Sequence, residues 1–144
     1  MPEVTSFHSY DPVENIVYVT FPLVHLETRE EITAHFARAY KFWRDSCGGR
    51  KAYYVVGYDG FSVNLRENQF YAEQMRPILE ECAITVVRYG GGALQRIGAR
   101  LYNMKLHAPS RLYESREEAL AVVRALKAGE MRLDPQSGPR VLER

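Results

Sequence analysis

Three consecutive glycines are the residues of this sequence whose type and spacing most suggest a binding site. The run consists of Gly90, Gly91 and Gly92, flanked by Arg88 and Arg96. Consecutive glycines let backbone N–H groups converge on one spot, and the start of a helix favours an anion there. We therefore consider an anion-binding loop, although no Gly-Lys-Ser/Thr follows as in a P-loop. The simpler alternative is a tight turn that needs glycine only for its backbone geometry.

A second candidate segment, residues 59–64, follows the third predicted strand. We expect it at the same edge of the sheet as the triglycine loop, because ligands of open α/β sheets bind outside the carboxyl ends of the strands. Its candidate contact residues are Asp59, Phe61, Ser62 and Asn64, with Phe61 at the loop tip. The alternative is that Asp59-Gly60 forms a turn and Phe61 packs inward.

No recognisable motif for metal binding or for nucleophilic catalysis occurs elsewhere in the chain. The histidines fall on different segments without the spacing of metal ligands, at positions 8, 25, 35 and 107. No Gly-x-Ser-x-Gly elbow is present, and Cys47 and Cys82 form no Cys-x-x-Cys pair. We expect two free thiols near helix ends, with a disulfide between them left open. The sequence predicts no cofactor, no metal and no catalytic residue.

Composition favours one ordinary globular domain. The chain has 144 residues, of which 46% are hydrophobic and 26% charged, with a formal net charge of +1. This near-neutral balance offers no long-range attraction for nucleic acid or for acidic membranes. No apolar run is long enough to span a bilayer, and no secretory signal is visible at the start. We therefore expect a cytoplasmic protein that binds neither nucleic acid nor membrane.

Hydrophobic patterning predicts strands that alternate with helices. The predicted strands cover residues 4–10, 16–21, 52–56, 84–87 and 111–113. The first two are joined by turn residues and form a hairpin. The unbroken apolar runs at 52–56 and 84–87 are typical of strands that are covered on both faces in a parallel sheet. The expected fold class is α/β, with a mixed, mainly parallel sheet that starts with the hairpin and continues as αβαβαβα.

Capping residues mark where the predicted helices begin. Thr28 with Glu31, and Ser115 with Glu118, form capping boxes, and residues 64–67 form a third, similar cap. Pro77 predicts a kink in the second helix, or a break there. A further helix is expected after the glycine run, with its apolar residues between 94 and 104. The domain is expected to cover residues 1–129, followed by a flexible tail over 130–144.

This order of elements, over about residues 4–128, resembles the STAS (SpoIIAA-like) superfamily of small regulatory domains. The closing segment, with Ser115-Arg116-Glu117-Glu118 opening the last helix, is similar to the end of many such domains. The resemblance implies a regulatory partner-binding role, and in some members a phosphorylated serine where the helix after the third strand begins. Residues 64–67 contain no serine here, and Ser62 is the nearest hydroxyl. We therefore expect no phosphorylation switch at Ser62.

A weaker resemblance links several short segments to a C-terminal part of bacterial acyl-CoA:acetate CoA-transferases. The segments are residues 57–61, Tyr71, residues 87–89 and residues 112–115. Because that part lacks the transferase's catalytic glutamate, the likeness implies an accessory domain.

Two functions follow from these observations. The first is a non-enzymatic regulatory or protein-binding module with an unidentified protein partner, which could also form a homodimer. The second is a protein, or even an enzyme, that binds a small anionic or acyl ligand at residues 90–92. A pocket between the loops of Asp59 and Gly90 would favour the second function.

Overall fold

The computed structural model describes residues 4–91, 112–134 and 138–141, and its centre is a five-stranded sheet. The strand order is β1-β2-β4-β6-β7. These strands are β1 (Phe7–Asp11), β2 (Ile16–Thr20), β4 (Ala52–Gly57), β6 (Ala83–Tyr89) and β7 (Leu112–Tyr113). Strand β1 runs antiparallel to β2, and every other pair in this sheet is parallel. The predicted mixed, mainly parallel α/β sheet is confirmed, and the strands predicted at 52–56 and 84–87 are adjacent and parallel in it.

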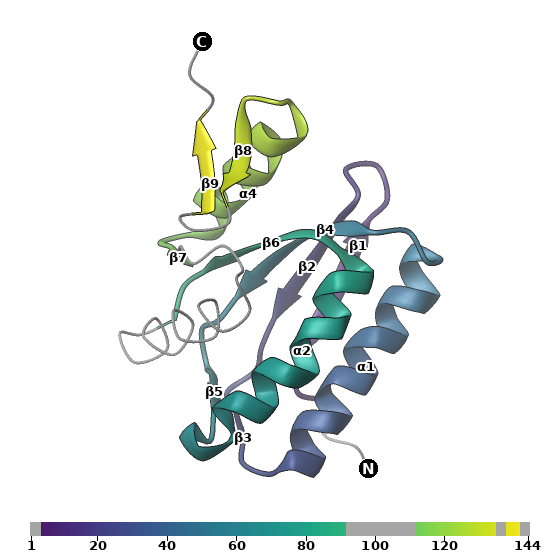
Figure 1. Cartoon of the computed structure of the whole chain (residues 1–144), viewed down its shortest axis with the longest axis vertical. Helices are drawn as coiled ribbons and strands as arrows, with labels where there is room; N and C mark the ends of the chain where they lie inside the picture. Colours follow the sequence, from purple (N-terminus) through teal and green to yellow (C-terminus); the bar gives the residue numbers. More distant parts are fainter. Residues whose placement is uncertain (1–3, 92–111, 135–137, 142–144) are drawn as a thin grey trace.

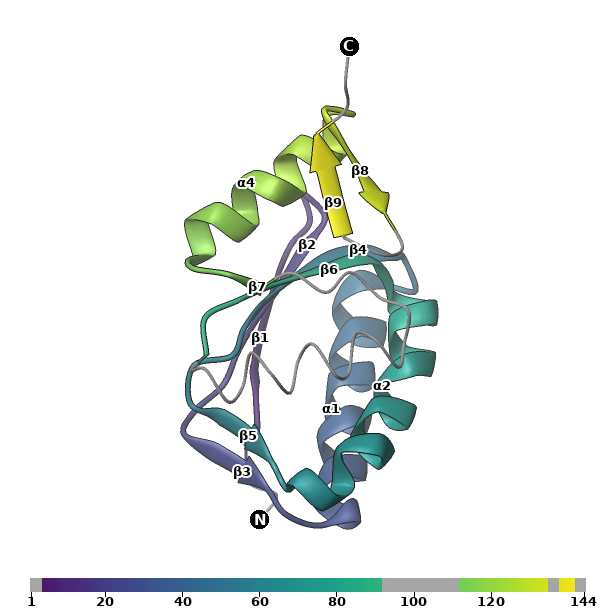
Figure 2. The ribbon, with the colours of Figure 1, turned by 60° about the vertical axis from the view of Figure 1, so that its left-hand side comes forward.

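Helices cover both faces of this sheet. Helices α1 (Arg29–Cys47) and α2 (Asn68–Cys82) lie on one face, and α4 (Arg116–Lys127) lies on the other (Figures 1 and 2). Successive residues of β2 point to opposite faces, so Val17 packs with α1 and α2 while Ile16 packs with α4. Both residues are fully buried. Burial on both faces explains the unbroken apolar runs of the central strands.

Both predicted capping boxes are present. The Thr28 hydroxyl accepts from the Glu31 N–H, and the Ser115 hydroxyl accepts from the Glu118 N–H. Each box glutamate accepts from the N–H of the residue before the cap, whereas in a standard capping box it accepts from the N–H of the cap residue itself. The boxes therefore fix the chain as it enters α1 and α4.

The start and middle of α2 differ from the prediction. Asn64 caps a short 3₁₀ helix, η1 (Leu65–Glu67), and the α-helix proper starts only at Asn68. The helix then continues through Pro77 to Cys82, so the predicted alternative of a break is wrong. Packing of Met75 and Cys82 in the core on either side of Pro77 holds the helix together.

Two short strands were not predicted. Strands β3 (Val24–Leu26) and β5 (Phe61–Val63) pair in parallel and form a separate two-stranded sheet. This sheet lies at the opposite end of the molecule from α4 (Figures 1 and 2). Its inner side chains pack against α1 and α2 in a cluster that includes Leu26, Ile32 and Tyr71. Residues 61–63 are therefore strand, where the sequence predicted a loop.

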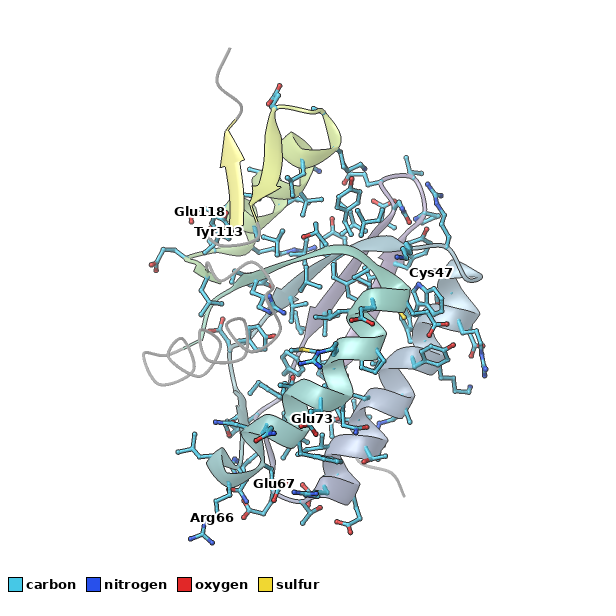
Figure 3. All side chains as sticks on the ribbon, in the orientation of Figure 1. Cys47, Arg66, Glu67, Glu73, Tyr113 and Glu118 are labelled. Carbon is cyan, nitrogen blue, oxygen red and sulfur yellow. The ribbon has the colours of Figure 1, made fainter. Side chains whose placement is uncertain are left out.

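Each of the first two helices ends in a free, buried cysteine. Cys47 ends α1 and Cys82 ends α2, and both belong to the same core cluster. Figure 3 shows Cys47 at the end of α1 that lies far from Arg66 and Glu67 of η1. Burial raises the pKa of the Cys82 thiol to about 12, so it is an unreactive thiol at neutral pH.

The segment after Glu130, which the sequence predicted as a flexible tail, contains a hairpin. Strand β8 (Met131–Asp134) runs antiparallel to β9 (Gly138–Val141), and the two form a sheet of their own. The helix predicted after the glycine run lies outside the described residues. Among the helices that the structure describes, none is long and apolar enough to cross a membrane.

Candidate functional site

The two loops singled out in the sequence meet directly. One carboxylate oxygen of Asp59 accepts a hydrogen bond from the Gly91 N–H at 2.9 Å, and the Gly90 N–H donates to the Tyr113 carbonyl at 3.0 Å. The loops therefore share one edge of the sheet, as expected. A carboxylate of the chain itself, however, already occupies the Gly91 donor and would repel a second anion.

Backbone geometry accounts for the glycine at position 90. Its φ is +75°, and a Cβ built there would lie 3.0 Å from both carboxylate oxygens of Asp59. A larger residue would be strained by its backbone and crowded by its neighbour. These observations support the tight-turn alternative for this part of the run, while Gly92 and Arg96 lie outside the described residues.

Arg88 and Phe61 both point into the interior. Arg88 is 3% exposed, and its Nε donates to the Tyr58 hydroxyl at 3.2 Å. Phe61 is 4% exposed and packs its ring against Phe21, with the ring centroids 4.4 Å apart. Phe61 is therefore not the exposed loop-tip contact that we considered, because alternation along β5 turns it inward and Ser62 outward.

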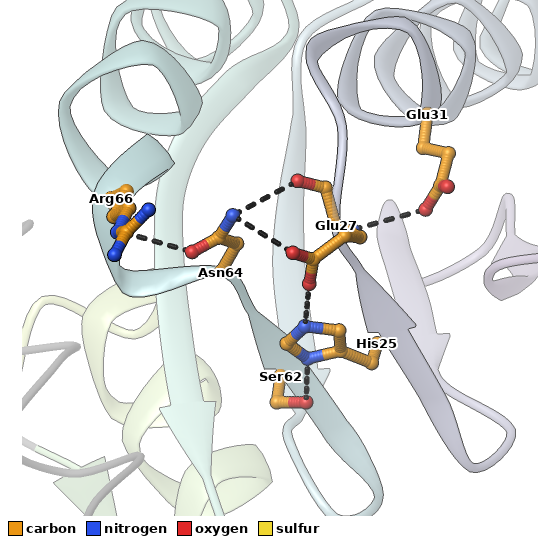
Figure 4. Close-up of polar contacts among 6 residues, drawn as sticks. All are labelled: His25, Glu27, Glu31, Ser62, Asn64 and Arg66. Carbon is orange, nitrogen blue, oxygen red and sulfur yellow. Dashed lines mark hydrogen bonds and ion pairs between the residues drawn. The ribbon is translucent and has the colours of Figure 1, made fainter.

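The outer face of the β3–β5 sheet holds a chain of polar contacts that we call the polar cluster: His25, Glu27, Ser62 and Asn64 (Figure 4). Ser62 Oγ lies 2.8 Å from His25 Nδ1, and His25 Nε2 lies 2.6 Å from a carboxylate oxygen of Glu27. The other carboxylate oxygen of Glu27 accepts from the Asn64 amide at 3.2 Å. The cluster thus connects a hydroxyl, an imidazole and a carboxylate in series.

The β-strand register creates this cluster. His25 lies opposite Ser62 in the parallel pair. Glu27 follows His25 by two residues and Asn64 follows Ser62 by two, so all four side chains share one face. The Asn64 amide also donates to the Glu27 carbonyl, and its oxygen accepts from the Arg66 N–H (Figure 4). Asn64 therefore ties the end of β3 to the start of η1.

A groove of about 310 Å³ lies beside β3. All three residues of β3 line it, together with Thr5 and part of α1, namely Glu30, Glu31, Ala34 and Arg38. No residue of β5 lines it, so the groove follows the edge of β3 that faces away from β5. Three consecutive strand residues can line one groove only through the strand's edge, because their side chains alternate between two faces.

A buried network closes one side of this groove. The Thr5 hydroxyl lies 2.8 Å from His35 Nδ1 and accepts from the Arg38 guanidinium at 3.1 Å. Burial lowers the pKa of His35 to about 4, and the charges of His8 and Arg38 contribute to the lowering. His35 is therefore neutral at pH 7, and its Nδ1 shares a hydrogen bond with the Thr5 hydroxyl.

Ser62 and Asn64 are among the contact residues predicted from the sequence, whereas His25 and Glu27 are not. Neither metal-ligand spacing nor a nucleophile elbow connects His25 with Ser62 in the sequence. The available signal was the spacing of two residues in His25-x-Glu27 and in Ser62-x-Asn64. That signal becomes visible only if both segments are recognised as strands. Among the described residues, no group of three or more metal-ligating side chains is present.

Comparison with known proteins concerns the fold. No family model matches the chain, and no curated protein matches it. Among solved structures, the chain is similar to an uncharacterised protein of the DUF3478 family from Shewanella loihica PV-4, described as having a SpoIIAA-like fold. The TM-score is 0.56 at 10% identity, over 83% of this chain and 92% of that chain. The chain thus has a SpoIIAA-like fold, as its element order indicated.

Proposed function

We propose that this chain is a regulatory, protein-binding module that holds an extended segment of a partner protein along the free edge of β3. The observation that carries the proposal is the groove between that edge and α1. Adding a strand to an exposed sheet edge is a common way to recognise peptides, because main-chain hydrogen bonds supply affinity while flanking side chains supply specificity.

The backbone of β3 is oriented for this role. The Val24 N–H donates to the Gly60 carbonyl, and the Leu26 carbonyl accepts from the Asn64 N–H, so both groups face β5. Successive backbone groups of a strand point to opposite edges, so the N–H and C=O of His25 face the groove. Among the described strands, only β5 pairs with β3. One residue of β3 therefore presents both a donor and an acceptor to an incoming strand.

The lining determines which segment fits. Glu30 and Arg38 lie eight residues apart on α1, which corresponds to about 12 Å along a helix. An extended chain covers that length in about four residues. Exposed Ala34 and half-buried Val24 supply an apolar middle between these charges. The complementary segment has about four residues, with a basic side chain toward Glu30 and Glu31 and an acidic one toward Arg38.

The alternative function, binding of a small anionic or acyl ligand at residues 90–92, has less support. The N–H groups of Gly90 and Gly91 already bond Tyr113 and Asp59. The Asp59 carboxylate also makes the local charge unfavourable for an anion. Titration with inorganic phosphate under thermal unfolding separates the two functions, since only the alternative predicts stabilisation.

A peptide selection tests the proposal even though the partner is unidentified. A phage-displayed library of random 12-residue peptides is selected on the full chain and counter-selected on Ala34→Trp, which fills the groove. Exposed Ala37 does not line the groove, so Ala37→Trp is the matched control. We expect peptides that bind the parent and Ala37→Trp equally and bind Ala34→Trp at least tenfold more weakly.

Hydrogen exchange then locates the bound peptide. Strand addition at β3 should slow exchange of the His25 amide, whereas binding elsewhere should leave it unchanged. If no selected peptide is sensitive to Ala34→Trp, the groove is not a peptide site. Size-exclusion chromatography of the parent and Ala34→Trp shows in parallel whether a second copy of the chain is the partner, because only then does the substitution dissociate a dimer.

A further inference from the structure

The structure also points to a chemical role for the polar cluster, which shares His25 with the groove. We propose that Ser62 is a nucleophile that accepts the acyl group of an activated ester, with His25 as its general base. Nothing in this proposal requires a protein partner. It rests on the series of contacts that connects the hydroxyl of Ser62, the imidazole of His25 and the carboxylate of Glu27.

Distances and protonation both suit this role. An activated serine needs a base within hydrogen-bond reach, and a third group that orients the base. Ser62 Oγ lies 2.8 Å from His25 Nδ1, and Glu27 lies 2.6 Å from Nε2. An ionised carboxylate can only accept, so Nε2 carries the imidazole proton. Nδ1 then presents its lone pair, and the Ser62 hydroxyl donates its proton toward it.

The surroundings give an ester access and keep the geometry fixed. The side chains of His25 and Glu27 are 50% and 60% exposed, so the cluster faces solvent. Ser62 is half-buried on a paired strand. Asn64 holds the second carboxylate oxygen of Glu27, and Glu31 accepts from the Glu27 N–H. Glu27 is thus held in place from two sides and acts as a positioning residue for His25.

The reaction balances without any further reactant. Ser62 Oγ attacks the carbonyl carbon of the ester while its proton moves to His25 Nδ1. The carbon–oxygen bond to the leaving group then breaks, and the departing alkoxide takes the proton from His25. The products are an O-acyl Ser62 and an alcohol. The negative charge of Glu27 stabilises the imidazolium that forms between the two steps.

Acetylation by p-nitrophenyl acetate tests the proposal on the full chain. Release of p-nitrophenolate gives the rate, and mass spectrometry of the intact protein and of its peptides locates the acetyl group. We expect one acetyl group on Ser62 and none on Ser46, an exposed serine of α1. General-base assistance typically contributes about 10²–10⁴-fold. We therefore expect His25→Gln to slow Ser62 labelling at least tenfold, and Ser62→Ala to abolish labelling at this site.

Glu27→Gln separates a chemical role from a structural one. If Glu27 stabilises the imidazolium, Glu27→Gln should label Ser62 more slowly than the parent, whereas Glu27→Asp, which keeps the negative charge, should restore most of the rate. Thermal unfolding of each variant confirms that the fold is intact. The proposal is overturned if Ser62 stays unlabelled in the parent, or if its labelling rate is unchanged in both folded His25→Gln and folded Glu27→Gln.

Discussion

At the scale of single residues, two histidines stay neutral because the packing around their rings excludes water: His35 is buried and His8 is half-buried. His35 is 4% exposed and lies among Phe21, Phe36 and Phe61. His8 stacks on Phe42, and burial lowers its pKa to about 4 as well. Both imidazoles would gain a proton more readily in the unfolded chain, where the pKa is near 6.5.

This difference makes stability depend on pH. The folded pKa is the lower one, so the unfolded state binds more protons as the pH falls from about 6.5 to 4. The stability that the two neutral histidines contribute is therefore fully present above about pH 6.5 and is lost as the pH falls toward about 4. Full protonation of His35 alone would cost about 3 kcal/mol. We expect His35→Gln to flatten the pH dependence of the unfolding midpoint between about pH 6.5 and 5.

Urea denaturation at several pH values measures this effect. In the variant, the free energy of unfolding should still change with pH, but less steeply than in the parent, because His8 remains. Parallel curves for the parent and His35→Gln would show that His35 is not the group that couples stability to pH.

At the scale of elements, the central strands are so closely packed that one position admits no side chain. Gly57 ends β4 and lies opposite Tyr89, the last residue of β6. A Cβ built on Gly57 would lie 2.4 Å from the Tyr89 ring. That ring is half-buried and packs on the core cluster beneath α4, so it must shift if a side chain is added at Gly57. The glycine is therefore required by close approach, since its φ is not in the left-handed region.

A double-mutant cycle tests this packing. Overpacking a core typically costs about 1–3 kcal/mol, so we expect Gly57→Ala to destabilise the fold by that order. In the Tyr89→Ala background the same change should cost little, because the ring that it meets is gone. The coupling energy follows from urea denaturation of the four proteins. Additive effects at the two positions would contradict the proposed clash.

At the scale of the whole molecule, the described chain consists of a central layered part and smaller units attached to it. The five-stranded sheet carries helices on both faces, while β3–β5 and β8–β9 form separate two-stranded sheets. The β3–β5 sheet packs on α1 and α2 through Leu26, Phe61 and Val63. The β8–β9 hairpin follows α4 and adds no strand to the central sheet.

We therefore expect the chain to tolerate loss of its C-terminal segment. A protein that ends at Glu130 keeps every strand of the central sheet and all of α4. Its thermal midpoint should stay within a few degrees of that of the full chain. Calorimetry of the two proteins measures the difference. A drop of about ten degrees or more would mean that the hairpin is part of the folded core.

The sequence by itself determined the fold class, since local signals specify each main element. Each of these signals acts within a few residues. They are the β-branched runs of β2, β4 and β6, the capping serine and threonine, and Gly48 in the left-handed C-cap of α1. Strands β3 and β5 carry no such signal, because three residues show too little alternation to be distinguished from a loop.

Only the tertiary structure decided what the candidate site contains. Phe61 turned inward because β3 supplied a partner strand for β5, and the same pairing placed His25 against Ser62 across 37 positions of sequence. In the same way, Asp59 came within 2.9 Å of the Gly91 N–H only because β4 and β6 are neighbours. The physical reason is that such contacts depend on strand register, which is determined by which side chains the whole fold buries and not by local propensity.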